Sequence, residues 1–417
     1  MLLNLVRNNK IILKNTGYLS IIEILRMAMP FIALPYIIQT VGGENYGKAV
    51  FAQTIISYFS IFINWGLDIS AVKNVSVNRN NSVELNKIIS TVLTIKLILF
   101  LISFIFLLLC INVVALMNTY KVLLLFAFIT CFSEILFPVW FYQGIEKMKF
   151  LTIVRTASIL FYTIAIFIFI RQPADYEKIV LLQSLSNIVA GFISIYLLFY
   201  VNKIKLICPK YSDLKETFYS SFPFFMSRLS VILNNTMAKT ISGIFFSMEA
   251  VAAFDLAQKI ATVSLVPLQM LNQAVYPHIA KTMNRQFAKK FLNINACLSL
   301  FIALFVFILA PYAIHFFASE QLDEAVTLLR ILCLWIFCGG ITSYIGTPIL
   351  VSFGYPKPFN KSVILSTITL LFLYVLMSSI GIMTIYNFAI ALFLSELVIL
   401  IYRIFYCYKL RIFTINS

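Results

Sequence analysis

Residues 88–111 read IISTVLTIKLILFLISFIFLLLCI, and Lys96 is the one charged side chain in this run. The stretch is long enough to cross a bilayer, since a transmembrane helix needs about 20 mainly apolar residues. Similar stretches follow one another along the 417-residue chain, of which 61% is hydrophobic and only 12% charged. This composition is typical of a polytopic membrane protein and excludes a soluble enzyme.

The sequence predicts an all-α membrane protein of about 12 transmembrane helices, separated by short polar stretches. The predicted spans are residues 16–39, 46–66, 88–111, 121–143, 151–170, 179–200, 218–246, 250–276, 291–317, 326–347, 362–381 and 386–408. Because no connecting stretch is long, we expect no catalytic domain outside the membrane.

The second and eighth predicted spans begin alike. Glu44 precedes AQTI (residues 52–55), and Glu249 precedes AQKI (residues 257–260) at the same spacing. The two copies lie about half the chain apart, which favours the duplicated plan of many transporters. We therefore expect two pseudo-symmetric six-helix lobes, residues 1–205 and 206–417, around a central cavity.

The basic charge of the chain, +16 at pH 7, is concentrated in the N-terminus, alternate connecting stretches and the C-terminus. The positive-inside rule then places both termini in the cytoplasm, and the charge needs no nucleic-acid partner to explain it. The two histidines are isolated and the cysteines lack metal-ligand spacing, so we expect no metal and no cofactor.

Several predicted spans carry polar stripes. In the seventh, RLSVILNNTMAK (residues 228–239) places Arg228, Asn235 and Lys239 on one helical face. Each charge at the centre of a lone lipid-facing helix would cost about 2.5–3.5 kcal/mol. We therefore expect the stripes on the first, second, seventh and eighth spans to line a water-accessible cavity.

The excess of cations on these faces favours an anionic substrate such as a diphosphate, and the amides suit the hydroxyl groups of sugars. The predicted substrate-binding residues are Arg26, Arg228, Lys239, Lys259, Asn235, Asp255, Gln53 and Asn64. Acidic residues inside spans are candidates for ion coupling, here Asp68, Glu134 and Asp255.

Structural interpretations of some charges stay open. Asp255 and Lys259, one helical turn apart, would also suit an intrahelical ion pair, as would Glu23 and Arg26. We expect Arg403, near the end of the last span, to extend its side chain to the membrane surface.

Five stretches carry a resemblance to a known family. They are ENYG (residues 44–47), WGL (65–67), PVWFYQGIEKMKFLTIVR (138–155), LAQKIATVSLVPLQMLNQAVYPHIAK (256–281) and GTPILVSFG (346–354). Together they resemble the Wzx-type polysaccharide flippases of the multidrug/oligosaccharidyl-lipid/polysaccharide exporter superfamily, over nearly the whole chain. In that family, charged cavity residues on the first, seventh and eighth helices handle the head group. The matching positions here are Arg26, Arg228, Lys239, Asp255 and Lys259, with Phe254-Asp255 a departure that ranks Asp255 below the arginines.

The resemblance implies a flippase of the bacterial cytoplasmic (inner) membrane rather than an enzyme. It would move an undecaprenyl-diphosphate-linked oligosaccharide, the repeat unit of O-antigen or a similar surface polysaccharide, from the cytoplasmic to the periplasmic leaflet by alternating access. Membrane lipids and other polysaccharide-assembly proteins are the further partners implied. Two alternatives stay open: a multidrug or cation exporter of the same superfamily, and a membrane polysaccharide polymerase or ligase.

Overall fold

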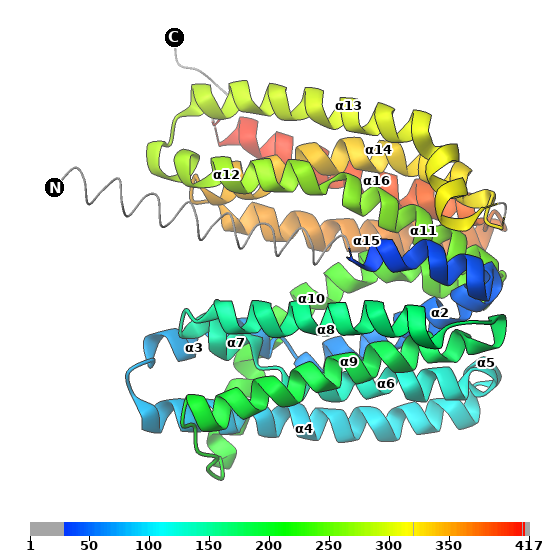
Figure 1. Ribbon diagram of the computed structural model, residues 1–417. Coiled ribbons are helices and arrows are strands. Elements are labelled where there is room, and N and C mark those ends of the chain that lie inside the picture. The colour runs from blue at the N-terminus through cyan, green and yellow to red at the C-terminus, as the bar shows by residue number, and fades with distance from the viewer. Residues whose placement is uncertain (1–28, 320, 411, 413–417) are drawn as a thin grey trace, which may run out of the picture. The chain divides into compact units, whose positions relative to one another are not determined.

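The computed structural model describes residues 29–319, 321–410 and 412, and these residues form helices and no strand (Figure 1). Within these described residues, ten helical stretches are long and apolar enough to cross a membrane. After the short apolar helix Met29–Val41, the helices are α2 (Gly43–Asn64), α3 (Leu67–Val77), α4 (Ser82–Val113), α5 (Ala115–Thr119), α6 (Lys121–Leu136), α7 (Val139–Gly144), α8 (Met148–Phe169), η1 (Pro173–Asp175), α9 (Tyr176–Tyr196), η2 (Leu197–Val201), α10 (Tyr211–Phe245), α11 (Met248–Ser264), α12 (Val266–Thr282), α13 (Arg285–Ala318), α14 (Glu324–Tyr344), η3 (Ile345–Val351), α15 (Pro356–Ile380) and α16 (Ile385–Lys409).

These helices confirm the predicted helical membrane fold. Ten predicted spans coincide with the ten apolar helical stretches, and the seventh falls on α10, a helix of 35 residues whose polar side chains set it apart. Most of the first predicted span, with Glu23 and Arg26, lies outside the described residues.

Polar residues mark where the long helices begin. Asn81 accepts a hydrogen bond from the backbone N–H of Glu84 at the start of α4, and Asn284 does the same for Phe287 at the start of α13. Such caps satisfy backbone donors that have no partner inside the helix. Helix α2 ends at its C-terminus before Trp65 and Gly66, which both adopt left-handed backbone conformations with φ of 47° and 69°.

The chain divides into two compact units. Unit 1 comprises the described residues up to Gly42 and Ile55–Phe225, and unit 2 comprises Gly43–Thr54 and the described residues from Met226 on. Helices α2 and α10 therefore each begin in one unit and end in the other. The sequence duplication and its lobes, residues 1–205 and 206–417, stay a prediction.

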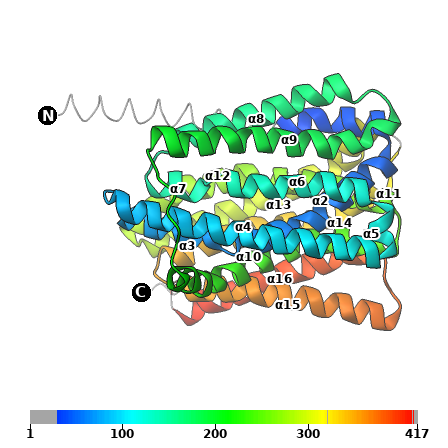
Figure 2. The same cartoon turned by 90° about the horizontal axis from the view of Figure 1, so that it is seen from below.

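In unit 1, α9 packs against both α6 and α8 (Figure 2). The end of α2 is held against the first half of α10, where the Trp65 ring stacks between Phe218 and Phe225 with centroids 4.3 Å from each. Gly66 permits this approach, because a Cβ at that position would lie 2.5 Å from the backbone nitrogen of Phe225.

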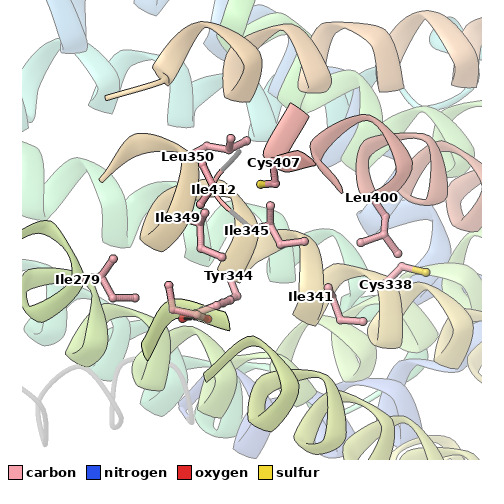
Figure 3. Packing of buried hydrophobic residues seen from close by; sticks show 11 residues of the cluster. Ile279, Cys338, Ile341, Tyr344, Ile345, Ile349, Leu350, Leu400, Cys407 and Ile412 are labelled. Atoms are coloured by element: carbon pink, nitrogen blue, oxygen red, sulfur yellow. Dashed lines mark hydrogen bonds between the residues drawn. The ribbon is translucent and has the colours of Figure 1, made fainter. Parts of the chain in front are cut away.

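In unit 2, α14 packs against α11, α13 and α16 (Figure 1). Its C-terminal part and η3 contribute Tyr344, Ile345 and Ile349 to an apolar cluster that also receives Cys407 from α16 (Figure 3). All four side chains are buried, so this core holds the α14–η3 stretch in place.

Candidate functional site

One buried cluster of charged residues lies in unit 2 and is centred on Asp255 of α11. We call it the Asp255 cluster; its members are Tyr46, Lys239, Asp255 and Lys259. The Asp255 carboxylate lies 3.1 Å from Lys239 Nζ and 2.7 Å from Lys259 Nζ, and it accepts a 2.6 Å hydrogen bond from the Tyr46 hydroxyl. Lys259 Nζ in turn donates to the Tyr46 hydroxyl at 2.7 Å, which ties the four residues together.

Two glycines bring the start of α2 close to the other helices of this cluster. A Cβ at Gly47 would lie 1.7 Å from the carbonyl oxygen of Met248, and one at Gly243 would lie 2.3 Å from the Phe51 ring. Only glycine allows such close backbone contact. The ENYG sequence therefore positions Tyr46 against Asp255, although the two residues are far apart in the chain.

The Asp255 cluster holds two ammonium groups and one carboxylate, and its net charge is positive. The Asp255 and Lys239 side chains are only 4% and 14% exposed, whereas Lys259 is 42% exposed. Asp255 is thus enclosed by its partners, and Lys259 is the member with open space beside it. This arrangement can orient a partly open cation toward an anion.

The second cluster lies in unit 1. We call it the Lys96 cluster; its members are Ser60, Asn64, Asp68, Lys96 and Glu134. Lys96 is 1% exposed, and its Nζ donates to Asn64 Oδ1 at 2.6 Å, Asp68 Oδ1 at 2.8 Å and the Glu134 carbonyl oxygen at 3.2 Å. The Glu134 carboxylate accepts from Ser60 at 3.0 Å and Asn64 at 3.1 Å. With two carboxylates and one ammonium among its members, this cluster has a net negative charge.

The structure places the predicted site residues in different surroundings. It brings Lys239, Asp255 and Lys259 together in unit 2, and Asn64, Asp68 and Glu134 together in unit 1. The alternative interpretation of Asp255 and Lys259 as an intrahelical ion pair is confirmed. Whether these residues bind substrate or couple ions stays a prediction.

Of the remaining predicted residues, Arg228 and Asn235 are exposed on α10, and Gln53 is half-buried on α2. Arg228 forms no ion pair with any residue that the structure describes. Arg26 lies outside the described residues. The predicted stripe on α10 therefore runs from exposed Arg228 to the more enclosed Lys239.

Three residues of the clusters, Tyr46, Ser60 and Lys96, were missing from the sequence-based set. Lys96 was visible as a lone charge in an apolar span, but its partners could not be identified from the chain order. Tyr46 is a member of the ENYG sequence, which was the available signal for it.

The prediction for Arg403 was wrong. Its side chain does not reach the membrane surface but is 5% exposed, donating to Ser362 Oγ at 2.9 Å and to the Thr342 carbonyl oxygen at 2.6 Å. The guanidinium also lies over the Phe359 ring, 4.7 Å from its centroid. Partners on α14 and α15 make burial less costly than sequence position alone suggests.

Solved structures define the class of protein to which this fold belongs. The chain is similar to a lipid II flippase MurJ in an inward closed conformation, with a TM-score of 0.77 at 15% identity over 95% of this chain and 90% of that one. It is also similar to an inward-facing multidrug resistance MATE family transporter of the MOP superfamily, with a TM-score of 0.75 at 15% identity over 93% and 94%. The fold is that of these membrane transporters.

The family follows from sequence comparison. The family model described as "Polysaccharide biosynthesis protein" matches residues 12–283, and the chain belongs to this family. Two relatives carry the name "Putative O-antigen transporter". The one from Escherichia coli (strain K12) is 26% identical over 86% of this chain and 88% of its own length. The one from Shigella dysenteriae is 24% identical over 66% and 69%.

Proposed function

We propose that the chain is a flippase for a lipid-linked oligosaccharide. Its substrate would be an undecaprenyl-diphosphate-linked repeat unit of O-antigen or a similar surface polysaccharide, moved from the cytoplasmic to the periplasmic leaflet of the bacterial inner membrane. The family, the names of the relatives and the flippase fold support this function. No covalent bond is made or broken, so the protein acts as a transporter and not as an enzyme.

The observation that carries the proposal is the net positive charge of the Asp255 cluster. One lysine would be enough to neutralise the charge of Asp255, but two lysines pair with this one carboxylate. The cluster therefore keeps one positive charge. At an effective dielectric constant near 20, a cation 4 Å from a phosphate charge contributes on the order of 4 kcal/mol. Lys259, with 42% of its side chain exposed, is the member that would contact the diphosphate.

The other members would position Lys259. Asp255 and the Tyr46 hydroxyl both contact its ammonium group, which restrains a side chain that otherwise has several rotatable bonds. Arg228, on the same helix as Lys239, is a second exposed cation, and arginine can bind phosphate oxygens through two parallel hydrogen bonds. We propose that both cations bind the lipid head group during transport.

The membrane potential could drive this transport. The distribution of Lys and Arg predicts that both termini lie in the cytoplasm. The cytoplasmic side is electrically negative, so a dianionic head group that moves to the periplasmic leaflet moves toward the positive side. The gain is about 2.3 kcal/mol per charge per 100 mV. Ion exchange through Asp68, Glu134 or Asp255 is the alternative means of coupling. Flipping in proteoliposomes under a valinomycin-set potential, with and without a pH gradient, separates the two.

The rival within this fold is an exporter of multidrug or cationic substrates. Such a substrate would need accessible carboxylates, and of the two charge clusters the Lys96 cluster is the one with more carboxylates than ammonium groups. Its carboxylates, however, are held by Lys96, Asn64 and Ser60. Asp68 is 37% exposed but is paired with Lys96, whereas the Asp255 cluster has one ammonium group more than it has carboxylates. This surplus cation favours an anionic substrate over a cationic one.

The proposed function is tested in the source bacterium. Deleting the gene should remove the surface polysaccharide and accumulate the lipid-linked oligosaccharide in the inner membrane. Lys259→Met should reproduce most of this defect at unchanged protein abundance, since its side chain is partly exposed. Lys178→Met is the matched control, because Lys178 also pairs with an aspartate, Asp175, at 2.6 Å but lies outside both clusters.

The outcomes separate the two functions. Loss of surface polysaccharide in the deletion strain and in Lys259→Met, with Lys178→Met unaffected, supports the flippase. A deletion strain with normal polysaccharide and increased sensitivity to cationic drugs would instead identify an exporter.

A further inference from the structure

A cavity of about 300 Å³ lies within unit 2, where α12 packs against α14 and η3, and several polar side chains contribute to its mainly apolar lining. Its polar lining consists of Gln269, Asn272, Gln273, Tyr276, Ser343 and Thr347. Among the lining residues that the structure describes, none carries a charge. The volume is at the small end of the range for sites that bind small molecules.

The α12 side of the cavity follows the helical repeat. Gln269, Gln273 and Tyr276 are spaced at i, i+4 and i+7, which places them on one face. Gln269 and Gln273 are exposed, and neither side-chain amide forms a hydrogen bond within the described part of the chain. Amides without partners are costly against lipid, so this face requires water or a polar ligand.

Asn272 is held in a fixed orientation at the cavity. It is 5% exposed; its Oδ1 accepts a hydrogen bond from Asn295 at 2.9 Å, and its Nδ2 donates to Ser343 Oγ at 2.9 Å. The Ser343 hydroxyl in turn donates a hydrogen bond to the Gly340 carbonyl oxygen at 2.8 Å. Since an amide has two donor hydrogens and two acceptor lone pairs, Asn272 retains one donor and one acceptor that a ligand could use.

The opposite side of the cavity is rigid and irregular. Thr347 and Pro348 belong to η3, a stretch of π-helix, and such wide turns are frequent at functional sites. Neighbouring Tyr344, Ile345 and Ile349 are packed in the apolar core (Figure 3). The core therefore fixes the backbone from which Ser343 and Thr347 line the cavity.

We propose that this cavity binds a neutral, hydroxyl-rich sugar of the translocated oligosaccharide. The inference rests on the proposed flippase function and adds a site for the glycan that is separate from the site for the diphosphate. Amide groups pair with neighbouring sugar hydroxyls as both donors and acceptors, and the Tyr276 ring offers an apolar body beside a polar tip. An uncharged lining gives a phosphate or a carboxylate no counter-charge, which favours a neutral sugar.

The positions of Lys259 and the cavity along the chain are consistent with separate sites for the diphosphate and the sugar. Gln269 of α12 follows Lys259 of α11 by ten residues, which corresponds to at most about 15 Å at the helical rise of 1.5 Å per residue. A lipid whose diphosphate contacts Lys259 would therefore have room for its sugars to reach the cavity. The glycan and the head group would be recognised by different parts of one predicted span.

Binding to the full-length protein in detergent tests the inference with two probes. One is the lipid-linked oligosaccharide extracted from the source bacterium, and the other is undecaprenyl diphosphate without sugar. The Gln273→Leu variant should weaken binding of the first probe about tenfold, as expected for one or two lost hydrogen bonds, and leave the second unchanged. Asn272→Leu should act in the same direction with a larger effect.

Unchanged binding of the sugar-free probe shows that each variant is folded. Gln286→Leu, an exposed glutamine at the start of α13, is the matched control and should bind both probes like the wild type. Equal weakening of both probes by Gln273→Leu, or no change in either, would overturn the sugar site while leaving the flippase intact. A wild-type protein that binds neither probe would overturn the proposed function as well.

Discussion

The two charge clusters are built from similar groups in opposite proportions. The Asp255 cluster surrounds one carboxylate with two ammonium groups, and the Lys96 cluster holds one ammonium and two carboxylates, of which Asp68 contacts Lys96 directly and Glu134 is linked to it through Asn64. Their exposure differs as well. In the first cluster the central Asp255 is enclosed and Lys259 is 42% exposed, whereas in the second Lys96 is enclosed and Asp68 is 37% exposed.

This difference shows how membrane helices can hold charge for two purposes. A buried ion of one sign is stabilised when it is paired and hydrogen-bonded, and the surplus ion of the other sign then defines what the cluster attracts. The Asp255 cluster would attract an anion, and the Lys96 cluster a cation or a proton. The comparison predicts that removing either central residue is more damaging than removing a peripheral one.

The largest effect is expected for Asp255→Asn. The change leaves Lys239 and Lys259 without their shared carboxylate, and breaking a buried ion pair from one side costs about 3–5 kcal/mol. We expect a strong loss of thermal stability in detergent and of abundance in membranes. Adding Lys239→Met should restore part of the stability, because one unpaired cation is then removed. No difference between the single and double variants would mean that the two lysines are not coupled through Asp255.

Lys96→Met should have a slightly smaller effect. It leaves the Asp68 carboxylate without its cation and the Glu134 carbonyl oxygen without its donor, but Asp68 is 37% exposed and can be hydrated in part. We expect a loss of about 3 kcal/mol, at the lower end for a broken buried pair. Thermal unfolding in detergent measures it, and Asp68→Asn in the same chain should recover part of the loss. A Lys96→Met variant as stable as the wild type would show that the cluster does not need its central cation.

The contrast between the clusters also shows what the sequence could and could not predict. The spans follow from local apolar runs, so residues 88–111 fall within α4 and residues 386–408 within α16. Even α10 was identified as a span despite Arg228 and Lys239, because residues 218–246 are hydrophobic over a length that can cross a bilayer. These sequence patterns are local, so they can be recognised without knowledge of the tertiary structure.

The partners of each charge depend on contacts between helices. Lys96 meets Asp68 and Glu134 from two other helices, and no periodicity along one span reveals that. Only the Asp255–Lys259 pair, one turn apart, could be foreseen as an interaction. The prediction for Arg403 was wrong for the same reason. The position of Arg403 near the end of a span suggested a side chain at the membrane surface, but hydrogen bonds to Thr342 and Ser362 on other helices keep the side chain buried.

The smallest effect is expected for Tyr46→Phe. This variant separates the orientation of Lys259 from the net charge of the Asp255 cluster. Tyr46→Phe removes the hydroxyl that donates to Asp255 and accepts from Lys259, yet leaves all three charges of the cluster in place. We expect a stability loss of about 1 kcal/mol, typical of one buried hydrogen bond, and a several-fold decrease in flipping in proteoliposomes. Tyr36→Phe is the control, since the Tyr36 hydroxyl also makes a 2.6 Å hydrogen bond, to the Ile170 carbonyl oxygen in unit 1, but contacts neither cluster. If both variants lose stability alike and only Tyr46→Phe slows flipping, the hydroxyl acts by orienting Lys259. Equal flipping rates in the two variants would mean that the charge of the cluster suffices without that orientation.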